Sequence, residues 1–212
     1  AYVRHCPRWL ETPLLWPDED LRMLEGSSAG AAAHHMRREA WLDFQSHVRP
    51  LVQADPEHFP ADVFTLHALL WARSTCAARA FPAWVVDGSP EHAGASCVLC
   101  PLLDLFNHRR GADLQWRRAE TGPRGLEFRL HPEASALKEG EEIWNDYGPK
   151  SNEDLLLSYG FCTPGNRDDV VHLLLRARGD LGRLRACAER LRPRHRGVAL
   201  VAAGGGRLFA LT

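Results

Sequence analysis

The sequence predicts an α+β fold, with helices in its first half and short strands in its second. Before Gly94, two stretches place apolar residues at helical spacing, at about residues 31–51 and 60–80. After Gly94, short apolar segments alternate with turns, which is typical of strands in small sheets. At 212 residues, 45% of them hydrophobic and 25% charged, the chain is expected to form a packed core rather than long disorder.

The first half contains three expected helical segments. A short one starts at Pro17, because proline and the acids that follow it favour a first helical turn. The second starts at about Ala31, and Pro50 is expected to cut or kink it near its end. Its apolar residues fit one helical face: Met36, Trp41, Phe44, Val48 and Leu51. The third follows Pro60, continues to about Ala80 and buries Val63, Leu66, Leu70 and Trp71.

The second half contains the candidate strands. They lie at 97–99, 114–117, 126–130, 142–144 and 170–175. Between the last two, Ser151 and Asp154 have the spacing of a capping box, which predicts a short helix that ends near Gly160. The tail from Arg176 is arginine-rich and is expected to be partly helical.

Charge and cysteine usage narrow the function. Twenty-six basic and 27 acidic residues give a net charge of -1, which disfavours a nucleic-acid partner. No apolar run approaches the roughly 20 residues of a membrane span. Of six cysteines only Cys97 and Cys100 form a close pair, and no second pair follows at metal-ligand spacing. We therefore expect no metal site and a reducing compartment. Common hydrolase, protease and nucleotide-binding motifs are absent, and Cys–His catalysis stays open.

Two segments carry more specific information. Residues 101–108 read Pro-Leu-Leu-Asp-Leu-Phe-Asn-His, an apolar strand that ends in a polar turn. Residues 140–161 place one Tyr-Gly pair before the capped helix and another after it. The tyrosines at the two ends of this helix could converge on a pocket. The alternative is that both are ordinary half-buried aromatic residues.

Both segments resemble the SET-domain protein methyltransferases, and most of all the branch that includes the Rubisco large-subunit lysine methyltransferase. That branch has a strand ending in Asp-Leu-x-Asn-His, matched at 104–108, and a later Tyr-Gly-x-Lys-Ser-Asn block, matched from Tyr147 to Phe161. A weaker match joins Trp71-Ala72 to Arg79, although Ala78 stands where the family has Ser. The resemblance covers roughly residues 1–175.

The resemblance implies a SET fold of short β-strands in small sheets with a helical insertion. Residues 1–26 would be a lead-in from the N-terminal SET part, and 27–93 the helical insertion. Residues 94–175 would form the C-terminal SET core with the cofactor and catalytic motifs, and 176–212 the start of a C-terminal helical region. The glycine-rich cofactor segment of the branch is not found, so the chain is expected to be a fragment that lacks the N-terminal SET segment.

The function implied is S-adenosylmethionine-dependent N-methylation of lysine in a non-histone protein. Tyr147 matches the catalytic tyrosine, which would orient the reacting groups and stabilise them electrostatically. The cofactor-binding positions are Asn107, His108 and Phe161, and the target-pocket positions are Arg79, Asp104 and Tyr159. The expected partner is a protein substrate of an intracellular monomer in the cytoplasm, nucleus or plastid, with no nucleic acid or membrane.

Two other functions stay open. Histidine methylation by the same fold needs no ammonium deprotonation, so its target pocket can be more polar. A binding or scaffold protein without turnover is the other alternative, because the start of the cofactor site is not found. Arg79 and Asp104 could also form a buried ion pair that braces the pocket.

Overall fold

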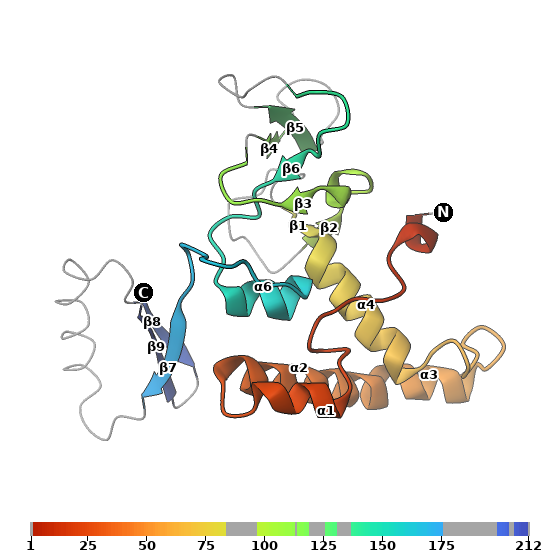
Figure 1. Cartoon of the computed structure of the whole chain (residues 1–212). Helices are drawn as coiled ribbons and strands as arrows, with labels where there is room; N and C mark the ends of the chain where they lie inside the picture. The colour runs from red at the N-terminus through yellow and green to blue at the C-terminus, as the bar shows by residue number, and fades with distance from the viewer. Residues whose placement is uncertain are drawn as a thin grey trace. The chain divides into compact units, whose positions relative to one another are not determined.

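The computed structural model describes seven stretches of the chain, at residues 2–83, 97–112, 114–118, 126–130, 137–175, 199–203 and 206–211 (Figure 1). The chain divides into two compact units. The first comprises Ala1–Leu10 and Trp71–Pro149, and the second comprises Glu11–Leu70 and Lys150–Thr212. This division crosses the domain boundaries expected from the sequence, because the lead-in, the insertion and the core each contribute to both units.

The first unit contains two small sheets. Helix α4 (Leu66–Arg79) ends in it and continues directly into a strand (Figure 1). The strands are β1 (Ala80–Pro82), β2 (Cys97–Leu99), β3 (Asn107–His108), β4 (Leu114–Arg118), β5 (Leu126–Leu130) and β6 (Trp144–Asn145). Short 3-10 turns, η1 (Tyr2–His5) and η4 (Leu103–Leu105), complete the unit. β1 pairs with β2, and the larger sheet has the order β3-β6-β4-β5.

The pairing of β3 with β6 brings the two informative sequence segments together. The strands run parallel, with Asn107 opposite Trp144 and His108 opposite Asn145. β6 also pairs in parallel with β4, where Leu114 lies opposite Asn145. The expected apolar strand with a polar turn at its end is wrong here, because Leu103–Leu105 is a 3-10 turn and the Asn-His pair itself is the strand. This strand is paired with the residues that closely precede the first Tyr-Gly pair.

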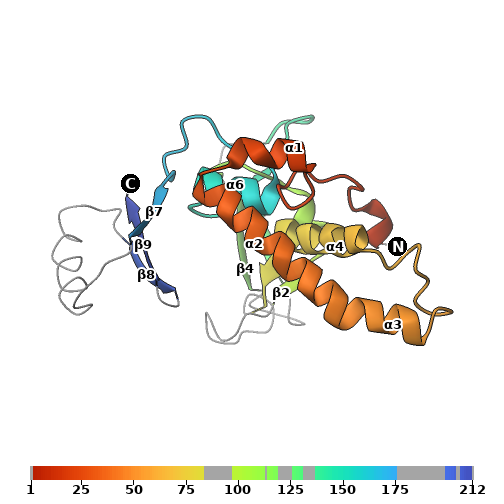
Figure 2. The ribbon, with the colours of Figure 1, turned by 90° about the horizontal axis from the view of Figure 1, so that it is seen from below.

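The second unit is mainly helical in its described part. It contains α1 (Asp18–Leu21), η2 (Arg22–Leu24), α2 (Ser28–Asp43), the π-helical η3 (Phe44–Val48), α3 (Arg49–Ala54), the start of α4, and α6 (Asn152–Tyr159). It also contains a sheet of β7 (Val171–Leu175), β9 (Gly206–Leu211) and β8 (Ala199–Ala203), in that order. Helices α2 and α6 lie side by side in both views of the ribbon (Figures 1 and 2).

Small side chains form the buried face of α2. They are Ala29, Gly30, Ala33 and Ala40. A Cβ at Gly30 would lie 2.2 Å from the carbonyl oxygen of Leu24, so only glycine fits there. Of the larger apolar residues that set the predicted helical face, Trp41 is 50% and Leu51 48% exposed, and the other three are half-buried. Alanine forms the buried face of α2 because small residues let another chain segment approach closely. A helical repeat of alanines is a weaker sequence signal than a repeat of large apolar residues.

Other sequence expectations on the first half are corrected in detail. Helix α4 begins only at Leu66, after a turn, and Val63 is 57% exposed instead of buried. Phe81 and Pro82 do not simply end this helix, because they belong to β1. Close to Pro50 the second helix changes type, since α2 ends at Asp43, η3 is π-helical and α3 starts with Pro50 in its first turn. A residue without a backbone N–H is tolerated in a first helical turn.

In the second half, the structure confirms the expectations that rest on residues close together in the sequence. Ser151 caps α6 in a complete capping box with Asp154, and Gly160 ends it in the left-handed conformation. A Cβ at Gly160 would lie 2.7 Å from the backbone carbonyl carbon of Glu11. The candidate strand at 142–144 is confirmed only at its end, because β6 covers Trp144–Asn145.

The described part of the tail is strand, so the expectation of helix is wrong for 199–203 and 206–211. β9 pairs in antiparallel orientation with both β7 and β8. Residues 176–198, where we also expected helix, lie outside the described residues. In the part of the chain that the structure describes, no helix is long and apolar enough to cross a membrane.

Candidate active site

Tyr147 is held at both ends by the segment that contains β3. Its backbone N–H donates to Nδ1 of His108 at 3.1 Å, and its hydroxyl donates to the carbonyl oxygen of Phe106 at 2.7 Å. The Tyr147 and His108 rings stack, with centroids 4.9 Å apart and an interplanar angle of 25°. Since Nδ1 accepts a hydrogen bond, neutral His108 carries its proton on Nε2.

Burial raises the pKa of Tyr147 above its ordinary value of 10.0. Two nearby charges act on the same pKa in opposite directions. The Arg79 guanidinium lowers it and the Asp104 carboxylate raises it further. The phenol therefore stays protonated throughout the physiological pH range, and it can donate and accept hydrogen bonds but not act as a strong base.

Asp104 is the centre of a buried polar group. Its side chain is completely buried, and Oδ2 accepts from Nη1 of Arg79 at 3.1 Å. The same nitrogen donates to the Asp104 carbonyl oxygen at 3.2 Å. The hydroxyl of Tyr2 also donates to Oδ2. Two buried atoms of this group, Oδ1 of Asp104 and Nε of Arg79, have no hydrogen-bond partner among the described residues.

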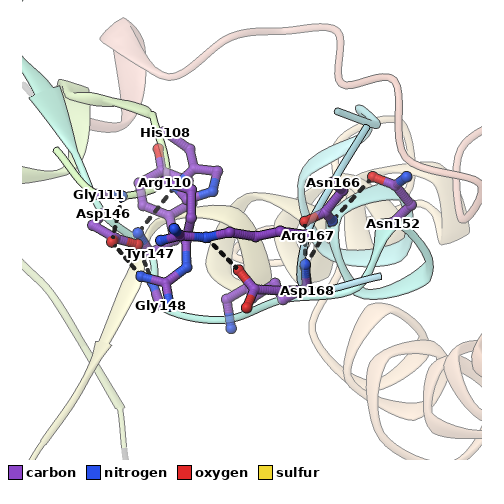
Figure 3. A network of polar contacts seen from close by, with 11 residues as sticks. His108, Arg110, Gly111, Asp146, Tyr147, Gly148, Asn152, Asn166, Arg167 and Asp168 are labelled. Carbon is purple, nitrogen blue, oxygen red and sulfur yellow. Dashed lines mark hydrogen bonds and ion pairs between the residues drawn. The ribbon is translucent and has the colours of Figure 1, made fainter. Parts of the chain in front are cut away.

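Asp146, next to Tyr147, binds the turn after Tyr147 and the loop after β3 (Figure 3). Its carboxylate accepts from the N–H groups of Gly111 and Gly148, both at 2.8 Å, and from Nη1 of Arg110 at 2.6 Å. Burial acts to raise its pKa, but these backbone donors and the Arg110 charge outweigh burial and lower the pKa below 3.8. Asp146 therefore stays ionised and joins the loop after β3 to the turn after Tyr147.

The expected cofactor pair lies on β3. Asn107 is exposed, and its Nδ2 donates to Oε1 of Glu142 at 2.7 Å, while His108 is half-buried. Asn145 lies opposite His108 in the neighbouring strand and is only 3% exposed. Its Oδ1 is buried and has no hydrogen-bond partner in the described chain. A polar ligand at this strand end would find an open acceptor.

The structure groups the predicted site residues in two sets. Five of them belong to the first unit: Arg79, Asp104, Asn107, His108 and Tyr147. The other two, Tyr159 and Phe161, belong to the second, where their ring centroids are 6.1 Å apart. Lys150 places its ammonium 6.0 Å from the centroid of the Tyr159 ring. The convergence of Tyr147 and Tyr159 on one pocket stays a prediction.

Around these two aromatic residues, side-chain amides hold the loop after α6 to the start of that helix. Asn166 donates to the carbonyl oxygen of Lys150 at 2.9 Å and to Oδ1 of Asn152 at 3.3 Å (Figure 3). Asn152 also donates through its backbone N–H to Asp169 at 2.8 Å. The helix N-terminus and the chain beyond Phe161 are thereby fixed to each other within the second unit.

Three polar residues of the first unit were missed by the sequence analysis. Asp146 could have been predicted from the sequence, because an acidic residue close to Gly in a turn commonly accepts backbone hydrogen bonds. Asn145 was detectable only as a polar residue at a position that the β-pattern makes buried. Tyr2 had no signal, because its partner lies 102 positions away. Among the described residues, no group of three or more His, Cys, Asp or Glu side chains is arranged to hold a metal ion.

The chain is similar in sequence to several lysine methyltransferases. It is 28% identical over 181 residues to the ribosomal lysine N-methyltransferase set10 of Schizosaccharomyces pombe, covering 85% of this chain and 31% of that protein. It is 28% identical over 174 residues to the human N-lysine methyltransferase SETD6, covering 77% and 34%. No family model matches the chain. The chain thus spans about a third of the length of these relatives.

Solved structures resemble the chain over nearly its whole length. The structure of Rubisco LSMT bound to AdoMet superposes with a TM-score of 0.66 and 21% sequence identity, covering 99% of this chain and 44% of that one. The SET domain of LSMT bound to MeLysine and AdoHcy gives a TM-score of 0.67 at 21% identity, with the same coverage. This chain therefore has the SET fold, and its sequence is similar to those of protein-lysine N-methyltransferases.

Proposed function

We propose that this chain belongs to an S-adenosylmethionine-dependent protein-lysine N-methyltransferase that acts on a non-histone protein. The observation that carries the proposal is the double attachment of Tyr147. Its N–H and hydroxyl donate to His108 and to the Phe106 carbonyl, so the tyrosine of one motif is fixed against the Asn-His strand of the other.

Tyr147 is the proposed catalytic residue. Because its hydroxyl proton is directed to the Phe106 carbonyl, the phenolic oxygen presents lone pairs as acceptors. Such an oxygen can orient an amine N–H and stabilise positive charge near the transferred group. Its raised pKa supports this role over that of a general base.

Arg79 and Asp104, with Tyr159, are proposed to line the target pocket. A lysine has a pKa of about 10.4 and must lose a proton before its nitrogen can attack. Burial of the amine disfavours the ammonium form, and the Arg79 charge acts in the same direction. The Asp104 carboxylate acts oppositely, since it attracts the protonated amine into the pocket. In this proposal, Asp104 favours entry of the charged amine and Arg79 favours loss of its proton, and the two side chains form one ion pair.

The residues at the end of β3 fit S-adenosylmethionine in their chemistry. Asn107 and His108 are proposed to hold its polar groups, and Phe161 to contact it as an aromatic surface. The open buried acceptor of Asn145 beside His108 supports a ligand with N–H donors at this place. When bound, S-adenosylmethionine supplies an electrophilic methyl group. The residues themselves bind, orient and exclude water.

The proposal is tested with the full-length protein in two steps. Calorimetric titration with S-adenosylmethionine should give saturable binding. Incubation with tritiated S-adenosylmethionine and an array of lysine peptides should then label a subset of peptides, and arginine-substituted copies of those peptides should stay unlabelled.

Two other results of this test would each support one of the alternative functions. Absence of S-adenosylmethionine binding would contradict the enzyme and support a scaffold. Transfer of label to histidine, read by mass spectrometry of the modified residue, would contradict lysine as the target. We also propose that the protein acts as a monomer on protein substrates without nucleic acid or membrane, which its net charge of -1 supports in part. Sedimentation of the full-length protein checks the monomer.

A further inference from the structure

Tyr2 contributes a hydroxyl to the carboxylate of Asp104, which we propose lines the target pocket. It donates to Oδ2, the same oxygen that accepts from Nη1 of Arg79. Oδ1 is buried and receives no hydrogen bond from any residue in the described part of the chain. One oxygen of the carboxylate thus receives both side-chain donors, and the other receives none.

This hydroxyl is not needed to attach the N-terminal segment. The indole N–H of Trp71 donates to the carbonyl oxygen of Pro7 at 2.8 Å. Cys6 is 6% exposed and packs in the core of the same unit. Both contacts remain if only the oxygen of Tyr2 is removed. The hydroxyl is therefore placed for its partner, Asp104, and not merely for anchoring the chain.

A fully buried carboxylate is costly unless donors satisfy it. Two donors on Oδ2 fix the plane of the carboxylate and leave the lone pairs of Oδ1 as its open acceptor sites. The ion pair even has a buried donor without a partner, Nε of Arg79, and it is not bonded to Oδ1. A cationic amine is the group best suited to a buried, charged acceptor of this kind.

We infer that Tyr2 is a positioning residue of the target pocket, which with Arg79 holds Oδ2 of Asp104 so that Oδ1 remains the acceptor for a protonated amine. This inference rests on the proposed function, because it takes an amine as the target. It extends to Tyr147, since the charges of Asp104 and Arg79 both act on that phenol.

The ionisation of Tyr2 supports the contact. Its pKa is raised above the ordinary value by burial first, and then by the hydrogen bond to Asp104 and the charge of Asp104. The Cys6 thiol acts on it in the same direction to a smaller degree. The other titratable groups close to Asp104 are Arg79, Cys100 and Tyr147. The contact therefore has an optical readout that requires no substrate.

The test compares Tyr2→Phe with Trp71→Phe in the full-length protein. Trp71→Phe removes a hydrogen bond from the same N-terminal segment without touching Asp104. Calorimetry measures S-adenosylhomocysteine binding first, and then binding of free L-lysine to that complex. Tyr2→Phe should weaken the affinity for L-lysine about tenfold, the loss expected for one hydrogen bond to a charged group. Affinity for S-adenosylhomocysteine should stay within about twofold in both variants, and Trp71→Phe should leave L-lysine binding nearly unchanged.

A double-mutant cycle shows whether Tyr2 acts through Asp104. In an Asp104→Asn background, Tyr2→Phe should weaken L-lysine binding by less than about twofold. Full additivity, an equal loss in Trp71→Phe, or unchanged L-lysine affinity in Tyr2→Phe would each overturn the inference.

Failure of the proposed function has a separate signature, namely a wild-type protein that binds neither probe. Ultraviolet titration of the three tyrosines of the chain then decides about Tyr2. Asp104→Asn should lower the pKa of Tyr2 toward its ordinary value, with Tyr2→Phe identifying the transition. A Tyr2 transition that Asp104→Asn does not move would overturn the inference.

Discussion

The two units of the chain differ in how they treat buried polar atoms. In the second unit, the described buried residues are mostly apolar, and polar Ser151 is satisfied by its capping box with Asp154. In the first unit, four buried side-chain atoms have no hydrogen-bond partner in the described chain. They are Oγ1 of Thr75, Nε of Arg79, Oδ1 of Asp104 and Oδ1 of Asn145. No described residue of the second unit has such an atom.

The difference indicates which unit is built to bind. An unsatisfied buried polar group costs about 1–3 kcal/mol, and such groups are rare in folded proteins. Three of the four atoms belong to residues in or beside the proposed site, so a ligand can supply the missing partners. The second unit has no such cost in its described part, and its proposed contribution to the site is two aromatic residues, Tyr159 and Phe161. Nothing in the structure explains the Thr75 hydroxyl.

The largest effect is expected from Tyr147→Phe. Methyl transfer should fall by about 10²–10³-fold, as when one positioned donor or acceptor is removed from an active site. Stability should fall by only about 1 kcal/mol, because a single hydrogen bond to the Phe106 carbonyl is lost. Initial rates with tritiated S-adenosylmethionine and chemical denaturation measure the two effects. Normal turnover in this variant would refute the role of Tyr147 and weaken the contrast between the units.

Leu155→Ala should have the converse effect. Leu155 is 1% exposed in the second unit, so its truncation leaves a cavity and should cost about 3 kcal/mol of unfolding free energy. The matched control is Leu51→Ala, which removes the same atoms from a side chain that is 48% exposed in the same unit. The control should cost about 0.5 kcal/mol. Equal losses in denaturant titrations would show that Leu155 is not part of a packed core.

The smallest effect is expected from Asp146→Asn, and it should depend on pH. The folded-state pKa of Asp146 is lowered, so its ionised form contributes stability above the unfolded-state value of 3.8, and that contribution is lost as the pH falls through the folded-state value. At neutral pH the variant should lose about 1 kcal/mol relative to wild type. The difference should shrink in unfolding titrations below pH of about 4.

The control for this pH dependence is Asp62→Asn. Asp62 is exposed in a turn of the second unit, so its replacement should leave stability nearly unchanged at every pH. A gap between wild type and Asp146→Asn that stays constant down to low pH would contradict the role of the ionised carboxylate.

Features set by residues close together in the sequence could be predicted, and those set by distant residues could not. The capping box of α6 and its end at Gly160 were predicted, because both signals lie within one helix. The α+β class was also predicted, whereas the pairing of β3 with β6 was not, because it joins residues far apart in the sequence. Trp41 was placed on the wrong face, because alanine contacts leave a weak periodic signal. The bond from Tyr2 to Asp104 joins distant residues and follows from tertiary packing alone.

Gly160 has a consequence for how relatives of this chain are recognised. Its backbone φ is +83°, and any side chain there would meet the backbone of Glu11 at 2.7 Å. The glycine of the second Tyr-Gly pair is thus required by the close approach of this segment to the backbone of Glu11, independently of any chemistry. Natural selection would preserve this glycine in a descendant that had lost catalysis but kept its shape. A search that relies on this pair therefore selects for the shape of the chain, whereas the catalytic role that we propose concerns Tyr147.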